Sequence, residues 1–568
     1  MQSPYQPLDP EDQQIRVAVL EPGSGSDAIK IRLRVESLLK DNAEEPQFEA
    51  LSYAWGNELS PHTIQVHDHV MSVGLNLEQA LRQFRYPDKE RILWVDALCI
   101  NQADVHERNS QVQIMGRIYS SANTVLVWLG CEDQADVEAM EMIMKTKFLD
   151  YQVFQTLTRI FERPWFCRVW VVQEFILARN DPMMYVGAFS IPWQAFLQQI
   201  IRHMGRRTPA VVAHFRTPDE PRLLYSWQFK RAMSNFLKLG RMRFGEPRAF
   251  AENLHFTSSF KATDPRDKVF GILGLHHPPT DPVQVTPDYD KTISEVLIDT
   301  SMSMIKHDPL GLYGRFPLHP LRDEHMSELC SLSSLPTWAL DPDINTRYAE
   351  TIHNYNQPEN MLQRFNLHIP QRTCKFQSPT RFSPDNVLHT VGTSFGTILY
   401  TSGELLRSTR DEFKPENLRL GIMHVMDRIY ETMLKPRNLQ GEDLWLTFVR
   451  NPQFLALEER RRRLFTKRGP PFNKTIFVTS NSHVGLTYHP DMLNGIRPGD
   501  VVVGLFGVSL PFVLRKVEQS NQYQIINVAS VSGHDLYHPE LEGAAEGTTE
   551  DDVWEDLDRY GLQEYKII

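Results

Sequence analysis

A chain of 568 residues is too long for one hydrophobic core, because single cores stop growing near ~250–300 residues. Hydrophobic residues make up 41% and charged residues 23%, which is typical of globular domains and excludes a largely disordered chain. The net charge is −11, and nine acidic residues lie between Glu540 and Asp558, so the rest carries about −2. This balance lacks the basic footprint of nucleic-acid binding, so we expect no nucleic-acid partner and a solvated acidic tail at 546–568.

The cysteines and the apolar runs bear on the compartment. The five cysteines are widely spaced and include no C-x-x-C pair, which argues against a disulfide framework and a zinc ribbon. The N-terminus is polar, without the apolar core of a signal peptide. The longest apolar run, 501–514, contains Gly and Pro and is shorter than the ~20 residues that span a bilayer. We therefore expect a cytoplasmic protein without a membrane span.

The N-terminal segments predict strands before the first long helix. Residues 15–20 and 29–35 read as two strands joined by a Gly- and Ser-rich turn, and 48–55 (FEALSYAW) as a third. Residues 62–73 alternate as a hairpin does, and 77–84 fit a short helix.

The stretch from Arg91 to Gly130 predicts a strand, a helix and a second strand. Residues 91–98 form a nearly continuous apolar run, as expected of a buried parallel strand. A helix is predicted to begin at Asp104, because Glu107 follows at the spacing of a capping box. Residues 124–129 (TVLVWL) complete a βαβ unit.

The remaining elements set the predicted domain plan. Helices are expected at 153–162 and 166–179, a strand at 183–186 and another helix from about Ser190 and Pro192. Further helices are predicted at 223–239, 265–275 and 293–305, and strands at 501–506, 512–517 and 523–529. We predict an α/β N-terminal domain with a parallel sheet at 1–205, a mainly helical region at 206–390, a β-rich module at 391–545 and the acidic tail.

Polar residues at the ends of the predicted strands are candidates for a binding crevice. In open α/β sheets, ligands bind outside the carboxyl ends of the parallel strands. The same residues would also suit ordinary turns, so both interpretations stay open. The candidates are Tyr53, Trp55 and Gly56 after one strand and Asp96, Cys99, Asn101 and Gln102 after the next, with Glu107 and Arg108 on the following helix.

Glu174 is the sharpest catalytic candidate. It follows Trp170 and Gln173 in an otherwise apolar stretch, RVWVVQEFILAR. A carboxyl buried there would have a raised pKa and could act as a general acid or base. The alternative is a buried ion pair of structural value, with Arg108, Arg163 or Arg168 as partner.

Other chemistry has less support. Cys99 could be a nucleophile only if a histidine lay nearby, and a lone cysteine at a strand end is usually a small core residue. His62, His67 and His69 lie on the predicted hairpin without a fourth ligand, so no metal site is expected. P-loop, G-x-G-x-x-G, G-x-S-x-G and H-E-x-x-H motifs are absent from the sequence.

Three blocks resemble the successive motifs of the fungal heterokaryon incompatibility (HET) domain. They are FEALSYAWG at 48–56, LWVDALCINQADVHERNSQVQIMGRIYSSANTVLVWLG at 93–130 and RPWFCRVWVVQE at 163–174. Downstream, ATDPRDKVFGILGL at 262–275, PDY at 287–289, LPTW at 335–338 and GDVVVGLFGVSLPFVLR at 499–515 are similar to segments of full-length members.

The resemblance implies a role in non-self recognition and programmed cell death after fusion of unlike hyphae. The HET domain has also been likened to the Toll/interleukin-receptor (TIR) domain, an α/β fold that includes NAD-cleaving enzymes. The first interpretation is therefore an effector or signalling protein that acts through protein partners or self-association. Two alternatives stay open. In one, the likeness to TIR domains implies an enzyme with Glu174 as its catalytic residue, NAD as its substrate and no cofactor. In the other, the protein is a non-enzymatic accessory protein with a degenerate domain.

Overall fold

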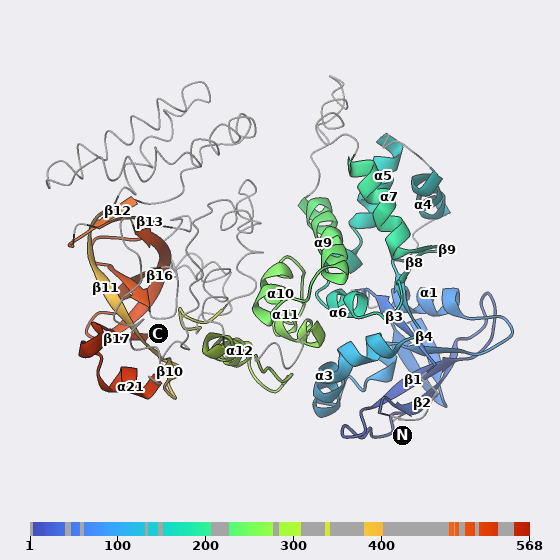
Figure 1. The fold of residues 1–568 in the computed structure, drawn as a ribbon. Coiled ribbons are helices and arrows are strands. Elements are labelled where there is room, and N and C mark those ends of the chain that lie inside the picture. The colour runs from blue at the N-terminus through green and yellow to red at the C-terminus, as the bar shows by residue number, and fades with distance from the viewer. Residues whose placement is uncertain are drawn as a thin grey trace. The chain divides into compact units, whose positions relative to one another are not determined.

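The computed structural model describes residues 4–39, 47–56, 62–130, 134–145, 151–205, 227–275, 283–307, 335–340, 380–401, 476–481, 483–487, 495–505, 511–531 and 550–568. The chain divides into two compact units, 1–292 and 293–568. The boundary between these units falls after Thr292, and the domain boundaries expected at 205, 390 and 545 stay predictions. Figure 1 shows both units with their elements labelled.

The first unit contains a nine-stranded sheet. Its order is β5 (His69–Val73), β4 (His62–Val66), β2 (Lys30–Ser37), β1 (Gln14–Leu20), β6 (Arg91–Trp94), β3 (Glu49–Tyr53), β7 (Thr124–Trp128), β8 (Met183–Val186), β9 (Phe189–Pro192). The predicted parallel sheet is corrected to a mixed one. Strands β6, β3, β7 and β8 are parallel, but β1–β2, β4–β5 and β8–β9 are antiparallel because short connections reverse the chain.

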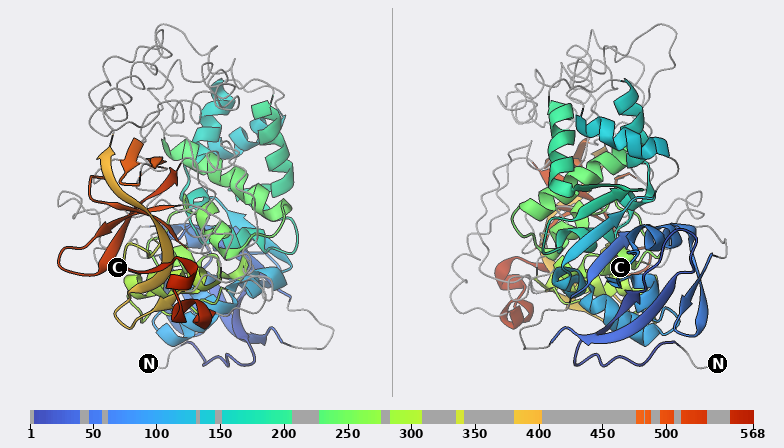
Figure 2. Two further views of the ribbon diagram at one scale, coloured as in Figure 1. Left: turned by 60° about the vertical axis from the view of Figure 1, so that its left-hand side comes forward. Right: turned by 90° about the vertical axis from the view of Figure 1, so that its right-hand side faces the viewer.

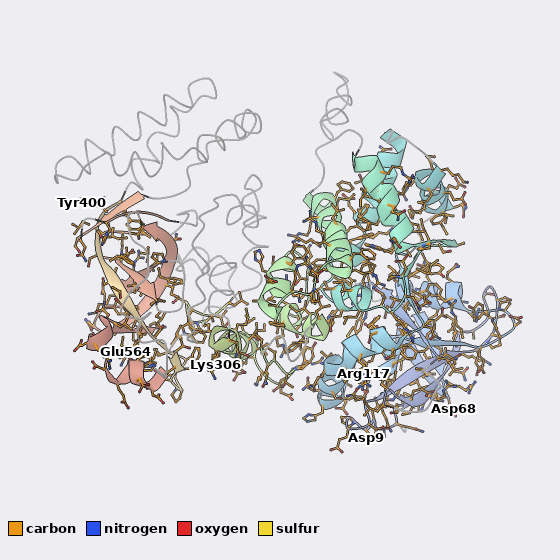
Figure 3. All side chains as sticks on the ribbon, in the orientation of Figure 1. Asp9, Asp68, Arg117, Lys306, Tyr400 and Glu564 are labelled. Carbon is orange, nitrogen blue, oxygen red and sulfur yellow. The ribbon has the colours of Figure 1, made fainter. Side chains whose placement is uncertain are left out.

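Helices of the first unit pack around this sheet. They are α1 (Leu75–Phe84), α2 (Asp96–Cys99), α3 (Val105–Ser121), α4 (Gln134–Lys145), α5 (Tyr151–Phe161), η1 (Pro164–Cys167), α6 (Val171–Ile176), α7 (Trp193–Gly205), α9 (Trp227–Phe244), α10 (Phe250–Phe256), α11 (Asp267–Phe270) and η2 (Leu273–Leu275). The predicted helix start at Asp104 is confirmed, since its side chain accepts from the Glu107 N–H at 3.1 Å. Only this half of the capping box forms, because the Glu107 carboxylate accepts from the Asn101 N–H and the Asp104 N–H donates to the Asn101 carbonyl. Arg117 of α3 (Figure 3) donates to the Leu38 carbonyl at 3.1 Å and so fastens the β1–β2 hairpin, drawn in blue in Figure 2.

Three predicted elements differ from those observed. The strand at 91–98 ends at Trp94, and Asp96–Cys99 form one helical turn, because a short apolar run does not distinguish a buried strand from a helix. The helix at 166–179 is two short helices, because the Val169 N–H donates to the Lys261 carbonyl at 2.8 Å and interrupts the helical ladder. The helix expected from Ser190 begins at Trp193, and Phe189–Pro192 pair with β8.

Aromatic side chains form much of the core between α5, α6, α7 and α9. Trp193 lies 4.2 Å from Phe175 and 4.3 Å from Phe236 between ring centroids, and Phe161 lies 5.1 Å from Phe236. All four side chains are fully buried. Helix α9 therefore completes the core on which the short helix α6 rests.

The second unit contains α12 (Ile293–His307) and a small β-barrel. Its strands are β10 (Arg381–Phe382), β11 (Leu388–Thr401), β12 (Ile476–Thr479), β13 (Val484–Thr487), β14 (Val501–Leu505), β15 (Phe512–Lys516), β16 (Gln522–Val531) and β17 (Gln563–Ile567), with α21 (Glu550–Glu555) and η7 (Asp558–Tyr560) near the end. Pairing of β11 with both β12 and β14 closes the ring. Gly396 has φ +103° at a register shift, where β11 bends from one partner to the other.

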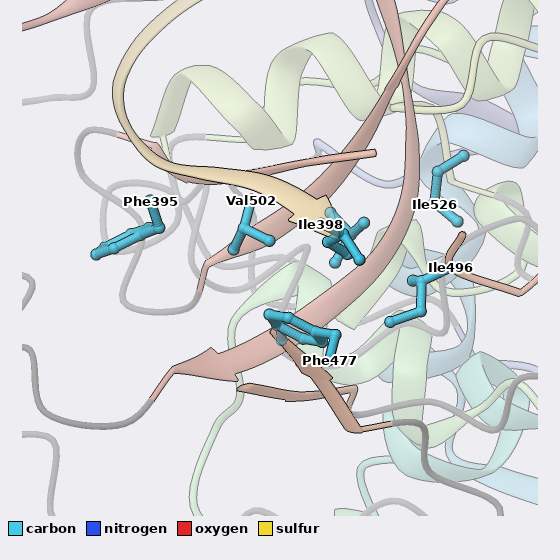
Figure 4. Packing of buried hydrophobic residues seen from close by; sticks show 8 residues of the cluster. Phe395, Ile398, Phe477, Ile496, Val502 and Ile526 are labelled. Carbon is cyan, nitrogen blue, oxygen red and sulfur yellow. The ribbon is translucent and has the colours of Figure 1, made fainter. Parts of the chain in front are cut away.

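The barrel has its own core and uses the acidic end of the chain. Phe395, Ile398, Phe477, Val502 and Ile526 pack together inside it (Figure 4). Strand β17 pairs with β11 and β16, and its Tyr565 and Ile567 are buried. The expected solvated tail at 546–568 is therefore corrected, because its last residues alternate as a barrel strand does. Residues 546–549 lie outside the described part.

Candidate functional site

The candidate site lies at the carboxyl ends of the central parallel strands. The chain leaves β3 for β6 on one side and later returns to β7 on the other, giving the order β6-β3-β7-β8. Where the connections from a central strand, here β3, lead to opposite sides of an open α/β sheet, a crevice forms at the carboxyl ends of the strands. Because β3 and β6 are parallel neighbours, the structure brings together the residues that follow them, as the sequence predicted.

Asp96 is the acceptor at the centre of one hydrogen-bond cluster. It is buried, and it accepts from the Trp55 indole N–H at 2.8 Å, from the Ala97 N–H at 2.7 Å and from the Tyr53 hydroxyl. Burial raises the pKa of Asp96, against the lowering effect of Arg168 and of these hydrogen bonds. The same burial, with the charge of Asp96, holds the pKa of Tyr53 well above its usual range, so Tyr53 serves as a donor.

Glu174 lies deeper, on α6, with 1% of its surface exposed. It accepts a hydrogen bond from the Ser52 hydroxyl of β3, and Ser52 in turn accepts from the Trp165 indole N–H at 2.8 Å. The pKa of Glu174 is raised to about 7, mainly because the carboxyl is buried and in smaller part because Asp96 is also negative. The charge of Arg168 and the hydrogen bond from Ser52 oppose this rise. Near neutral pH, Glu174 can therefore give up or take a proton, as a general acid or base must.

Arg168 is the cation that acts on both carboxyls. It is half-buried, it donates to the Tyr53 carbonyl, and its charge lowers the pKa of both Asp96 and Glu174. Of the three arginines proposed as structural partners of Glu174, only Arg168 acts on it in this way. Arg163 donates to the Leu129 and Gly130 carbonyls at 2.8 and 2.7 Å and pairs with Asp136.

Trp55 connects the cluster to solvent. It is 44% exposed, and the Gly56 that follows it has φ +77°, a left-handed conformation that favours glycine. Exposure therefore falls from Trp55 at the surface, through Asp96, to Glu174. An exposed indole of this kind can stack on a planar ring or a cation.

Four other candidates have structural partners. Cys99 is fully buried, which raises the pKa of its thiol to about 12, so the thiol stays protonated and is a poor nucleophile. Glu107 forms a buried ion pair with Arg16 at 2.6 Å and accepts from the Asn101 N–H at 2.7 Å. Gln102 donates to the Asp96 carbonyl at 3.1 Å and so supports the turn below the site.

The last three candidates contact Asp267, Phe270 and Tyr289 rather than Asp96. The Arg108 guanidinium stacks on the Tyr289 ring at 3.9 Å from the centroid. Trp170 donates to Asp267 at 3.1 Å, and Gln173 donates to the Phe270 carbonyl at 2.9 Å. These contacts hold the helix that bears Glu174.

Sequence reasoning missed Ser52 and Trp165 as parts of the site and considered Arg168 only as a structural partner. Ser52 had a recognisable signal, since it is a hydroxyl inside an otherwise buried strand. Trp165 had none, because a tryptophan beside a proline is equally typical of a core.

The described part of the chain offers neither a cluster of metal ligands nor a helix able to span a membrane. No group of three or more His, Cys, Asp and Glu side chains is placed to hold a metal ion there. His67 lies in the β4–β5 turn at φ +53°, and its ring accepts from the Leu33 N–H at 3.1 Å. Within the same residues, no helix combines the length and the hydropathy needed to cross a bilayer.

Comparison with known proteins agrees with the sequence motifs. The family model "Heterokaryon incompatibility protein (HET)" matches residues 48–174, a segment that contains Ser52, Asp96 and Glu174. Heterokaryon incompatibility protein 6, OR allele, of Neurospora crassa is 26% identical, in a match covering 54% of this chain and 54% of that relative. No solved structure matches. The chain thus carries a HET domain at residues 48–174 and is a distant homologue of heterokaryon incompatibility protein 6.

Proposed function

We propose that the protein is an effector or signalling component of heterokaryon incompatibility that triggers programmed cell death. The HET domain and the relative named for heterokaryon incompatibility support this role. The observation that carries it is the intact polar cluster of Glu174, Ser52 and Asp96 within the matched segment. A degenerate accessory domain would have no reason to keep a buried carboxyl, which is costly without a partner.

The test is induced expression in fungal cells, with growth and membrane integrity measured. The wild-type chain is expected to kill or arrest the cells, and Glu174→Gln is expected to be harmless at equal abundance. Glu138→Gln is the matched control, because Glu138 is exposed on α4. Harmless wild-type protein would refute the effector role, and toxicity that survives Glu174→Gln would place the activity elsewhere.

A second candidate function is cleavage of the nicotinamide–ribose bond of NAD. The observation that favours it is Glu174, which is buried and has a pKa of about 7, raised in part by the charge of Asp96; Asp96 in turn accepts from the exposed indole of Trp55. In its ionised form Glu174 would bind a ribose hydroxyl and stabilise an oxocarbenium-like transition state, as carboxylates do in glycoside hydrolysis. The order β6-β3-β7-β8 of the parallel strands is compatible with a TIR-like core and supports this proposal by analogy of fold.

The enzyme proposal is tested by NAD loss in solution. The purified full chain is expected to consume NAD and release nicotinamide, and Glu174→Gln to reduce kcat by at least about a hundredfold, the scale of a lost acid–base group. Glu138→Gln should match the wild type. A folded chain that leaves NAD intact would favour the alternative effector, which acts through protein partners or self-association.

A further inference from the structure

The helix that carries Glu174 is too short to hold its own position. Helix α6 has six residues, Val171–Ile176, whereas isolated helices shorter than ~12–15 residues are marginal in water. Glu174 is the only ionisable residue among them. The place of its carboxyl is therefore set by what α6 packs against, which includes α3, α9 and η2.

Residues beyond the matched segment bond to both ends of α6. At its start, Trp170 donates to Asp267 at 3.1 Å. At its end, Arg243 of α9 donates to the Phe175 and Ile176 carbonyls at 2.9 and 3.0 Å, which satisfies two terminal acceptors of the helix.

The middle of α6 is held by a side-chain amide. Gln173 is fully buried; it donates to the Phe270 carbonyl at 2.9 Å and accepts from the Gly274 N–H at 2.6 Å. Gln173 adjoins Glu174, so a displacement of its amide is transmitted to the carboxyl. Both partners of the amide belong to the 262–275 segment.

Glycine at position 274 allows this approach. A Cβ at Gly274 would lie 2.8 Å from the Gly116 Cα of α3, and a Cβ at Gly116 would lie 2.7 Å from the Gly274 Cα. The neighbouring atoms are backbone, which cannot rotate away. The added Cβ at Gly274 would also collide with the Gln173 side-chain oxygen.

The same segment is tied to α3 at a second point. Asp267 accepts from the Tyr289 hydroxyl at 2.6 Å, and the Tyr289 N–H donates to Asn109 of α3 at 2.9 Å. The Tyr289 ring lies under the Arg108 guanidinium. The segment thus links α6 to a long helix that packs on the sheet.

We propose that Arg243, Asp267 and Gly274 are positioning residues of the site, which fix α6 at the register where Glu174 meets Ser52. The inference rests on the proposed function only because it takes Glu174 as the residue on which activity depends. It extends the working unit from the matched segment, 48–174, to the first compact unit, 1–292.

The test follows the Glu174 carboxyl directly in full-length variants. Infrared spectra of the carboxyl stretch are recorded over a range of pH, and the Glu174→Gln spectrum is subtracted, which gives the titration midpoint of the Glu174 carboxyl. NAD turnover gives kcat and KM. Gly274→Ala should move the midpoint from about 7 toward the ordinary value of 4.5, because a displaced helix admits water. It should lower kcat by about a hundredfold at nearly constant KM, the effect of misplacing a group by about 1 Å.

Arg243→Ala is the second variant, because it removes hydrogen bonds without adding atoms to the core, and Arg243→Lys should restore part of the midpoint and of kcat. Two controls lie on the same helix. Gly240→Ala meets only the flexible Leu197 side chain at 3.1 Å, and Arg241→Ala removes an exposed arginine.

The outcomes separate the two proposals. A shifted midpoint in Gly274→Ala or Arg243→Ala, with unchanged controls, supports the positioning role even if the wild type leaves NAD intact. Wild-type midpoints and kcat in both folded variants would overturn it. Lower melting temperature alone, with an unmoved midpoint, would also overturn it, since that is the mark of a merely structural contact.

Discussion

Replacing Glu174 by Gln is expected to stabilise the first unit at alkaline pH. The folded state holds the pKa of this carboxyl at about 7, above the ordinary 4.5, because burial outweighs the opposing charge of Arg168. Between pH 4.5 and 7 the folded chain therefore binds more protons at this site than the unfolded chain, and stability falls as the pH rises through that window. Above pH 7 the loss is complete and amounts to about 3 kcal/mol, at ~1.4 kcal/mol per pH unit.

Glutamine has the shape of the protonated acid and can still accept from the Ser52 hydroxyl. The gain from Glu174→Gln should thus approach about 3 kcal/mol at pH 8 and vanish near pH 4.5. The assay is urea unfolding of the full chain at both pH values, with the transition of the first unit followed separately.

The opposite sign would refute this reasoning. If Glu174 were a structural ion pair with Arg168, its pKa would be depressed, and Glu174→Gln would cost about 3–5 kcal/mol by leaving a buried cation unpaired. Destabilisation at pH 8 would therefore support the structural interpretation. If Glu174→Gln loses activity and gains stability, the Glu174 carboxyl serves function while lowering the free energy of unfolding.

Three further predictions concern separate parts of the chain. Trp55→Ala should change the unfolding free energy by less than about 1 kcal/mol, because the indole is 44% exposed; chemical denaturation measures this change. The same variant should raise the pKa of Asp96 further, because it removes a hydrogen-bond donor; a carboxyl titration measures that shift. Asp500→Asn should lower the stability of the barrel by about 3 kcal/mol, because the largely buried Arg515, bonded to Asp500 at 2.7 and 2.8 Å, would lose its counter-charge. Calorimetry should show the barrel transition falling and the transition of the first unit unmoved. A fragment of residues 1–205 should show no cooperative urea transition, whereas residues 1–292 should show one, because the shorter fragment lacks the aromatic and hydrogen-bonding contacts of α9. A cooperative transition of 1–205 with the same urea midpoint as 1–292 would contradict this prediction.

The sequence predicted most elements because their patterns were local. The start of α3 at Asp104 and the apolar face of this helix depend only on spacing along one helix, and both are confirmed. The sheet was harder, because pairing of distant strands leaves no local pattern. Apolar runs therefore indicated strands such as 124–129 but not that the sheet is mixed.

Errors arose where tertiary contacts decide the backbone. Residues 166–179 have the composition of one buried helix, but the Lys261 carbonyl takes the Val169 N–H and divides it. At the acidic end, the charges of 550–558 hid the buried Tyr565 and Ile567 of β17. Average charge describes solvation of a segment, whereas alternation at single positions decides whether it forms a strand.

The two carboxyls of the site differ in how far sequence could place them. Asp96 directly follows a parallel strand, so the rule for strand ends locates it without knowledge of the rest of the fold. Glu174 lies on a helix of six residues, and its location depends on Arg243, Gly274 and Asp267, which lie outside the segment matched by the HET family model. The match at 48–174 therefore contains the groups that would do chemistry but not those that orient one of them. Substitutions that alter activity should then fall on both sides of Glu174 along the chain, wherever they contact α6.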